Sequence, residues 1–249
     1  MIKDQLQQYV SGLDLAAPSS AYPVNKSVVK KPDSDQEQSF LNARSLVSFA
    51  SGVTGSNKQH ILDSTLFAQL AANKQFPEEG QSIEWYQCFI SVMSKLGWIV
   101  EDGEISVFDA SKGLVEVENV IIDVLTSALG GTYITVITKT MGALKSLSKQ
   151  DGKVRAFEKN THTQTQGAFQ VGLALEENNT VSLNLSTFLL KTTEEIRTIL
   201  FFKSSKESVH LEYCVRKATL NVEVYEGVSK MISSKLNTMT GQFIAEIDI

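Results

Sequence analysis

Residues 115–149 read VEVENVIIDVLTSALGGTYITVITKTMGALKSLSK, and this stretch decides the fold that the sequence predicts. Two segments with apolar residues at helical spacing meet at Gly130-Gly131. Glycine adopts left-handed backbone angles without steric cost, so the pair stops the first helix and turns the chain. We therefore expect two antiparallel helices, the αα-hairpin, that join a helical first half to a β-rich second half.

The apolar face of the αα-hairpin has two readings. It can pack under a sheet as core, or it can leave the body and enter a bilayer, as inserting hairpins do in some toxins. Each helix of about 15 residues is roughly 22 Å long, short of a hydrocarbon core of about 30 Å. This length favours the core reading. If the hairpin does contact a membrane or a partner, the candidate residues are Val120, Val124, Tyr133 and Ile137.

The composition describes an ordinary globular chain with enough apolar residues for a sizeable core. Of the 249 residues, 42% are hydrophobic and 20% are charged, and the net charge is −5. The acidic balance argues against nucleic acid as a partner, because phosphate binding requires a basic excess. It also gives no support to a polybasic membrane anchor.

Cysteine usage and the N-terminus bear on location. Two distant cysteines, Cys88 and Cys214, are too few for a disulfide framework and indicate free thiols in a reducing compartment. The first residues, MIKDQLQQYV, contain no apolar segment of the kind that signal peptides use. We expect a cytoplasmic protein, or one exported without a conventional signal peptide.

The chain divides at about residue 40. Residues 1–40 contain three of the four prolines and predict an extended or partly disordered arm. Residues 41–249 contain no comparable linker and predict a single α+β domain.

Two helices and a hairpin are expected in the first half of that domain. The first helix covers 56–74, with Ser56 as N-cap and Gln59 completing a capping box. The second covers 82–96 and ends at Gly97 as a C′ glycine. Asp102-Gly103 then predicts a turn between two short strands at 98–100 and 105–108.

The second half alternates apolar and polar residues, as strands do. Strands are expected at 154–157, 168–175, 181–186, 196–203 and 209–216, followed by a helix from Asn221 and a strand near 243–247. Short turns between them predict an antiparallel meander with one face in water. The fold class is therefore α+β: an antiparallel β-meander packed on one face against helices, including the central αα-hairpin, around a single core.

The candidate site residues are few. His162 lies in the polar stretch 160–166, whose side chains can hydrogen-bond a ligand, although most such stretches are plain loops. His60 and His210 show no metal-ligand spacing with it, and no cofactor motif is present, so we expect neither a metal nor a cofactor. His60 is expected at the solvated surface, and Cys88 is expected to pack in the core beside Trp85 and Phe89.

Cys214 alternates onto the polar side of its expected strand, together with His210. The strand rise separates the two by roughly 13 Å, too far for a thiolate–imidazole pair. An outward thiol can accept a reversible modification such as acylation. A helix over that face would bury the thiol instead, which is the commoner outcome.

One stretch resembles a family of uncharacterised bacterial proteins. The residues STLFAQLAANK at 64–74, then Trp85-Tyr86 and Gly97-Trp98, match its S-T-L-x-A-Q-L-A-A-N-K helix, W-Y helix and G-W strand. That resemblance covers nearly the whole chain after the arm and implies no chemistry. In size and mixed α/β character, though in no motif, the chain also resembles the family of the bacterial virulence factor Evf. This second resemblance implies an acylated cysteine, with Cys214 or Cys88 as the acceptor.

We expect a non-enzymatic binding or effector protein, of virulence type, that acts on a host membrane or a partner protein. An enzyme, a hydrolase or transferase with a site assembled from distant residues such as His162 and Cys214, is the first alternative, and it requires a histidine within reach of a nucleophile. A lipid-binding module is the second, and it requires a long apolar cavity between hairpin and sheet. The expected partners are thus membrane lipid or a host protein.

Overall fold

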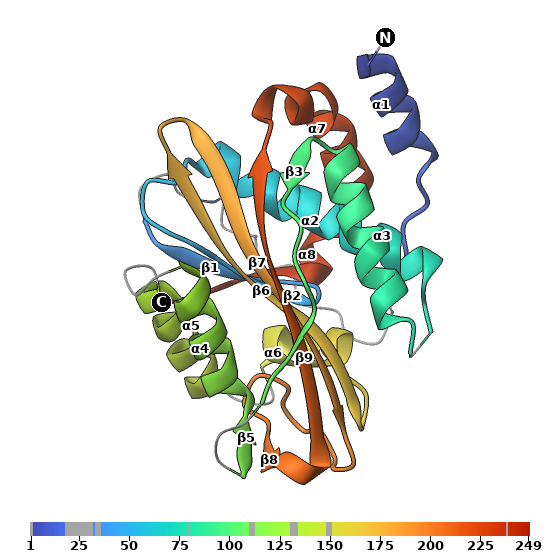
Figure 1. Cartoon of the computed structure of the whole chain (residues 1–249). Coiled ribbons are helices and arrows are strands. Elements are labelled where there is room, and N and C mark those ends of the chain that lie inside the picture. Colours follow the sequence, from blue (N-terminus) through green and yellow to red (C-terminus); the bar gives the residue numbers. More distant parts are fainter. Residues whose placement is uncertain are drawn as a thin grey trace.

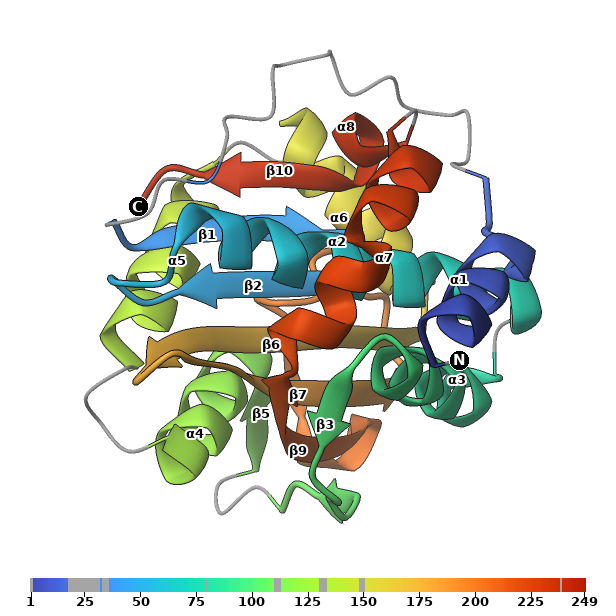
Figure 2. The same cartoon turned by 90° about the horizontal axis from the view of Figure 1, so that it is seen from above.

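The computed structural model describes residues 2–17, 32, 36–78, 80–109, 113–129, 134–147, 151–237 and 239–249. An eight-stranded mixed sheet is formed by these residues (Figures 1 and 2). Its order is β10 (Ile244–Ile247), β1 (Gln38–Asn42), β2 (Ser45–Phe49), β6 (Gln166–Glu177), β7 (Thr180–Thr192), β9 (Val209–Leu220) and β3 (Trp98–Val100), with β4 (Ser106–Val107) also on β9. Strands β2 and β6 run parallel, and the other neighbours in this sheet run antiparallel.

The meander expected in the second half is confirmed by β6, β7 and β9. Strands β6 and β7 meet at Asn178-Asn179, which both adopt positive φ angles of 49° and 61°. This geometry suits a two-residue hairpin turn, and asparagine tolerates it better than most residues. The α+β class of a single domain is therefore as expected.

Helices cover both faces of the sheet, however, and not one (Figure 1). The register explains why: Ala174 pairs with Leu183, and Leu173 pairs with Asn184. Leu173 on β6 and Leu183 on β7 therefore point to opposite sides, and each side needs an apolar cover. The expectation of one face in water is wrong for this reason.

One face packs against α2 (Gly55–Gln75), α3 (Ser82–Lys95) and α7 (Val222–Leu236), and α1 (Ile2–Gly12) adds to the same apolar core from outside α7. The S-T-L-x-A-Q-L-A-A-N-K stretch lies in α2, where every residue from 61 to 72 is buried. Thr54 caps α2 through a bond from the Asn57 backbone N–H, so the capping box expected at Ser56 is wrong. Gly97 ends α3 at φ +99°, as expected. Helix α1 falls within the N-terminal arm and packs on α7.

The other face packs against α4 (Val117–Leu129), α5 (Ile134–Ser146) and α6 (Gly152–Thr161). Helices α4 and α5 form the expected αα-hairpin, and the turn at Gly130-Gly131 lies outside the described residues. Helix α6 replaces the strand expected at 154–157. The Asp151 carboxylate caps it by accepting from the backbone N–H groups of Lys153 and Val154, at 2.8 and 3.4 Å.

Two further expectations of strand pairing are wrong. Segments 98–100 and 106–107 do not pair with each other but lie in succession along β9, and Gly103 between them packs on that strand. A Cβ atom on Gly103 would come within 2.5 Å of Val215 O, so glycine serves close approach here and not a turn. The strand expected at 196–203 is a loop that buries Ile199 and Leu200, and only β8 (Lys203–Ser205) pairs, with β5 (Leu114–Glu116).

The remaining elements are short. A 3-10 helix covers Lys206–Ser208, and α8 (Thr240–Phe243) precedes β10.

Candidate functional site

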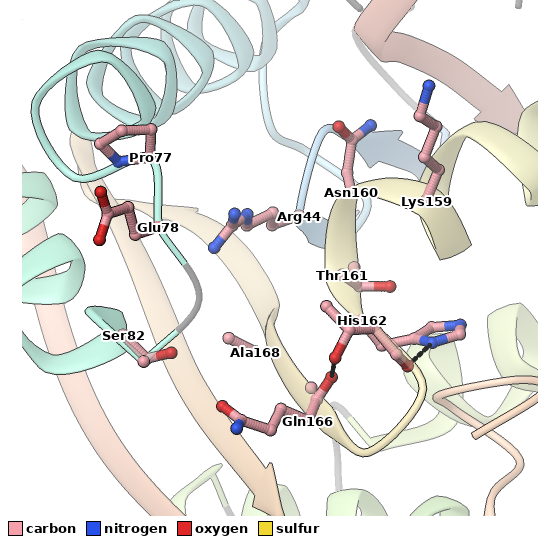
Figure 3. Close-up of a pocket in the computed structure, with 13 residues that line it drawn as sticks. Arg44, Pro77, Glu78, Ser82, Lys159, Asn160, Thr161, His162, Gln166 and Ala168 are labelled. Atoms are coloured by element: carbon pink, nitrogen blue, oxygen red, sulfur yellow. Dashed lines mark hydrogen bonds between the residues drawn. The ribbon is translucent and has the colours of Figure 1, made fainter. Parts of the chain in front are cut away.

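Two hollows open beside α6, one polar and one apolar. The polar cleft has a volume of about 110 Å³, and its polar lining includes Arg44, Glu78, Ser82, Lys159, His162 and Gln166 (Figure 3). The apolar cavity has a volume of about 350 Å³ and is lined mainly by Leu41, Leu144, Leu147, Val154, Phe157, Leu200 and Phe201.

Arg44 reaches the polar cleft from the tight turn between β1 and β2. Ala43 in this turn has a φ of 53°. Gln69 on α2, which is fully buried, holds the turn from both sides: its Oε1 accepts from Arg44 N at 2.8 Å, and its Nε2 donates to Asn42 O at 3.0 Å. The backbone of Arg44 is therefore fixed by helix α2.

The Arg44 guanidinium is a largely buried cation. Its Cζ lies 5.0 Å from the centre of the Trp85 ring, and Trp85 is itself held by a 2.7 Å bond from Nε1 to Asn73 Oδ1. Burial lowers the pKa of Arg44, and the Nε atom has no hydrogen-bond partner. No carboxylate in the described part of the chain forms an ion pair with this guanidinium.

His162 follows the last residue of α6 and is fixed through both ring nitrogens. Nδ1 donates to Thr163 O at 2.7 Å, and Nε2 forms an ion pair with Glu158 Oε2 at 2.8 Å. Burial alone would lower the pKa of His162, but the bonds to Glu158 and Thr163 raise it above its usual value. The same Glu158 oxygen accepts from Ile199 N at 2.9 Å. This pair thus connects the polar cleft to the loop over the apolar cavity.

The apolar cavity lies between α5, α6 and residues 198–203, on the hairpin side of the sheet. Lys145 and Lys203 also line the cavity. Lys145 Nζ lies 2.8 Å from Glu118 and 5.6 Å from the centre of the Phe201 ring, and Lys203 Nζ lies 2.9 Å from Glu116. Both lysine side chains remain about half exposed, at 58% and 50%.

Cys214 lies on the other face of the sheet, beneath α3. Its side chain is 3% exposed, and its Sγ lies 4.0 Å from the hydroxyl of Tyr86. Burial and the neighbouring thiol raise the pKa of Tyr86 to about 12, so the phenol stays protonated and supplies no base. His162 contacts Glu158 and Thr163 on the hairpin side, so Cys214 and His162 do not form one site.

The other predicted candidates also have defined places. Cys88 is partly buried on α3 and donates to Gln75 Oε1 at 2.9 Å. Burial raises the pKa of its thiol, which leaves less thiolate. His210 is exposed and pairs with Glu212 at 3.1 Å. His60 is half-buried against Tyr225, with ring centres 5.0 Å apart, so the solvated position expected for it is wrong.

The hairpin candidates for membrane or partner contact face the sheet. Val120, Val124 and Ile137 are 1%, 7% and 0% exposed, and Tyr133 lies outside the described residues. Contact through these side chains would require the αα-hairpin to leave the sheet. Among the described helices, none combines the length and the apolar character needed to cross a bilayer.

Sequence reasoning missed Arg44, Glu158 and the two lysines. Arg44 had one usable signal, since Asn42-Ala43-Arg44 separates two apolar runs, as a hairpin turn does. No sequence pattern pointed to Lys145 and Lys203, because these two cavity lysines lie 58 residues apart in the sequence (203 minus 145). In the described residues no cluster of side chains suits a metal ion.

No protein-family model matches this chain, and no curated protein matches it. Among solved structures it is similar to a delta-endotoxin, with 10% identity, a TM-score of 0.43, and coverage of 84% of this chain and 96% of that chain. It is also similar to the Evf virulence factor, with 13% identity, a TM-score of 0.36, and coverage of 99% and 91%. A third is the activated Cyt2Ba monomer from Bacillus thuringiensis subsp. israelensis, with 9% identity, a TM-score of 0.35, and coverage of 54% and 79%. These neighbours are toxins and a virulence factor, at similarities too low to assign an activity to this chain.

Proposed function

We propose that this protein is a non-enzymatic binding protein that holds an apolar chain, such as the acyl tail of a lipid, in the apolar cavity beside the αα-hairpin. The cavity itself is the observation that carries the proposal. An apolar cavity of roughly 150 Å³ is enough to hold benzene, and this one has about 350 Å³. That volume falls in the range of roughly 300–1,000 Å³ that small-molecule sites occupy.

The lysines of the cavity suit an anionic head group. Lys145 and Lys203 each use one N–H on a glutamate, and an ammonium group has three. Their partly exposed ammonium groups can therefore also bind a carboxylate or phosphate at the end of an apolar chain. A fatty acid, or a lipid with one free chain, has this combination of groups.

A role at a host membrane or on a partner protein, as an effector, is the wider setting that we propose. The cavity lies beside the αα-hairpin, and a chain taken from a bilayer would fill it. No catalytic group is needed for this function.

The test is a titration with a fluorescent fatty acid, followed by displacement with an unlabelled fatty acid. In Val154→Trp the larger side chain occupies the cavity from α6, and we expect affinity to fall by at least about fivefold, the factor that matches the lower end of the roughly 1–3 kcal/mol that overpacking costs. Val107→Trp is the matched control, because Val107 is 58% exposed on β4. Equal affinity of both variants, or no binding by the wild type, would refute the proposal.

The head group is tested with a pair of ligands. In Lys145→Met combined with Lys203→Met, fatty-acid binding should weaken, and binding of an alcohol of the same chain length should not. Equal weakening for both ligands would show that the lysines act only through packing.

A further inference from the structure

We propose that the polar cleft on the other side of α6 binds a compact oxyanion, a phosphate or carboxylate group, with Arg44 as its main cation. This site is separate from the apolar cavity and goes beyond the lipid-binding function.

The first argument is the missing counter-charge of Arg44. Its guanidinium is largely buried, with an Nε that has no partner. Buried arginines are almost always paired with a carboxylate or another anion, because an uncompensated charge away from water is costly. Among the described residues no carboxylate forms an ion pair with this guanidinium, and Glu78 lines the same cleft without pairing with it, so a ligand can supply the counter-charge.

The second argument is that Arg44 is held in place without using the hydrogen-bond donors of its guanidinium. Gln69 fixes its backbone, and the guanidinium lies over the Trp85 ring with Cζ 5.0 Å from the ring centre. A guanidinium that contacts an aromatic ring keeps its N–H groups for an acceptor, and a phosphate or carboxylate can accept from them in pairs. Little ordering is then left to be done when the ligand binds.

The start of α3 supports the same reading from across the cleft (Figure 3). No side chain caps this helix, because Gln81 Oε1 accepts from Glu78 N at 3.2 Å instead. Ser82, its first residue, lines the cleft. Uncapped N–H groups at a helix start favour an anion.

The charges around the cleft have both signs. Lys159 adds positive charge, the charge of protonated His162 is balanced by its ion pair with Glu158, and Glu78 on the opposite wall adds negative charge that would repel an anion. The cleft is small: its volume of about 110 Å³ is less than the roughly 150 Å³ of a cavity that holds benzene. A compact group such as a single phosphate or carboxylate suits that space.

The experiment is calorimetric titration of the full chain with inorganic phosphate, with acetate and with chloride at constant ionic strength, alongside thermal unfolding. We expect one site per chain that prefers phosphate or acetate over chloride. The stronger of the two identifies the group as a phosphate or a carboxylate. No preference over chloride would overturn the proposal.

The variants separate binding from folding. In Arg44→Met affinity should fall by at least about tenfold, the usual worth of a hydrogen bond to a charged group. Arg44→Lys should retain part of it, and Arg197→Met is the matched control, because Arg197 is exposed and paired with Glu195. In Glu78→Gln affinity should rise, since a repelling charge is removed.

Two results would contradict Arg44 as the main cation. One is wild-type affinity in Arg44→Met. The other is unchanged affinity in both Arg44→Lys and Glu78→Gln, two conservative variants that keep the test informative if Arg44→Met fails to fold.

Discussion

Helices α2 and α6 lie against opposite faces of the same sheet, and they differ strongly in how many of their side chains are buried. In α2 every residue from 61 to 72 is buried, whereas in α6 only Phe157 and Thr161 are buried. Both hollows described above border α6. The difference indicates that α2 is the more closely packed of the two helices, and that the hollows gather around α6.

The polar side chains of α2 make the same point. Thr65 accepts from Asn42 Nδ2 at 2.8 Å, Ser64 accepts from Trp98 Nε1 at 3.1 Å, and Asp63 accepts from Ser233 Oγ at 2.7 Å. Each bond ties α2 to a different element of the fold. The buried stretch of α2 is therefore explained by its role as a support for these elements.

The largest expected effect comes from truncating a side chain on each face. Phe67→Ala in α2 should cost about 3–5 kcal/mol of unfolding free energy, because Phe67 is fully buried. Phe201→Ala at the apolar cavity should cost about 1 kcal/mol, because that side chain is only partly buried beside an existing hollow. Urea unfolding measures both, and equal losses would remove the distinction between the faces.

A smaller effect is expected from Gln69, which connects helix α2 to the turn that carries Arg44 into the polar cleft. Gln69→Leu leaves Arg44 N and Asn42 O without their partners. It should cost about 2–4 kcal/mol, at roughly 1–2 kcal/mol for each group, the lower part of the usual range because the Arg44 bond is only partly buried. Gln7→Leu, which removes a single 3.3 Å bond to Gly227 O, is the control. Urea unfolding should separate the two variants; if they lose the same stability, α2 does not hold the turn.

The smallest effect concerns pH at the α6 face. The pKa of His162 is raised in the folded protein, so its ion pair with Glu158 stabilises fully below about pH 6.5, the ordinary histidine value. This contribution disappears as pH rises through the higher folded pKa. The stability lost in His162→Gln should therefore be larger at about pH 5.5 than at about pH 8.5.

Urea unfolding at both pH values measures this difference. His210→Gln, at an exposed histidine, controls for the loss of an imidazole. A loss in His162→Gln that stays constant with pH would show that the ion pair does not hold the loop over the cavity.

Sequence patterns predicted those elements whose signals are local. The Gly97 stop, the short turn between the strands expected at 168–175 and 181–186, and the Asn221 start of α7 each depend on the backbone preference of one or two residues. The strands predicted at 154–157 and 196–203 were wrong for a different reason. Their short apolar runs fit a strand as well as a helix or a buried loop, and only packing under the αα-hairpin decides between them.

The candidate site was largely beyond sequence reasoning. The polar stretch 160–166 drew attention to His162, but its partner Glu158 was not considered, because a single glutamate in a short helix carries no signal. Arg44 becomes notable only when its burial and its missing counter-charge are known, and both depend on elements far away in the sequence. Cavities likewise arise between elements, and no periodicity reports them.

The parallel pairing of β2 with β6 has a kinetic consequence. Residues 45–49 pair with residues 170–174, so about 120 residues must close into a loop before this part of the sheet can form. Strands β6, β7 and β9 need no such closure, because they are neighbours along the chain. Folding should therefore begin in the meander, and the pairing that docks the β10-β1-β2 unit onto it should be the slow step.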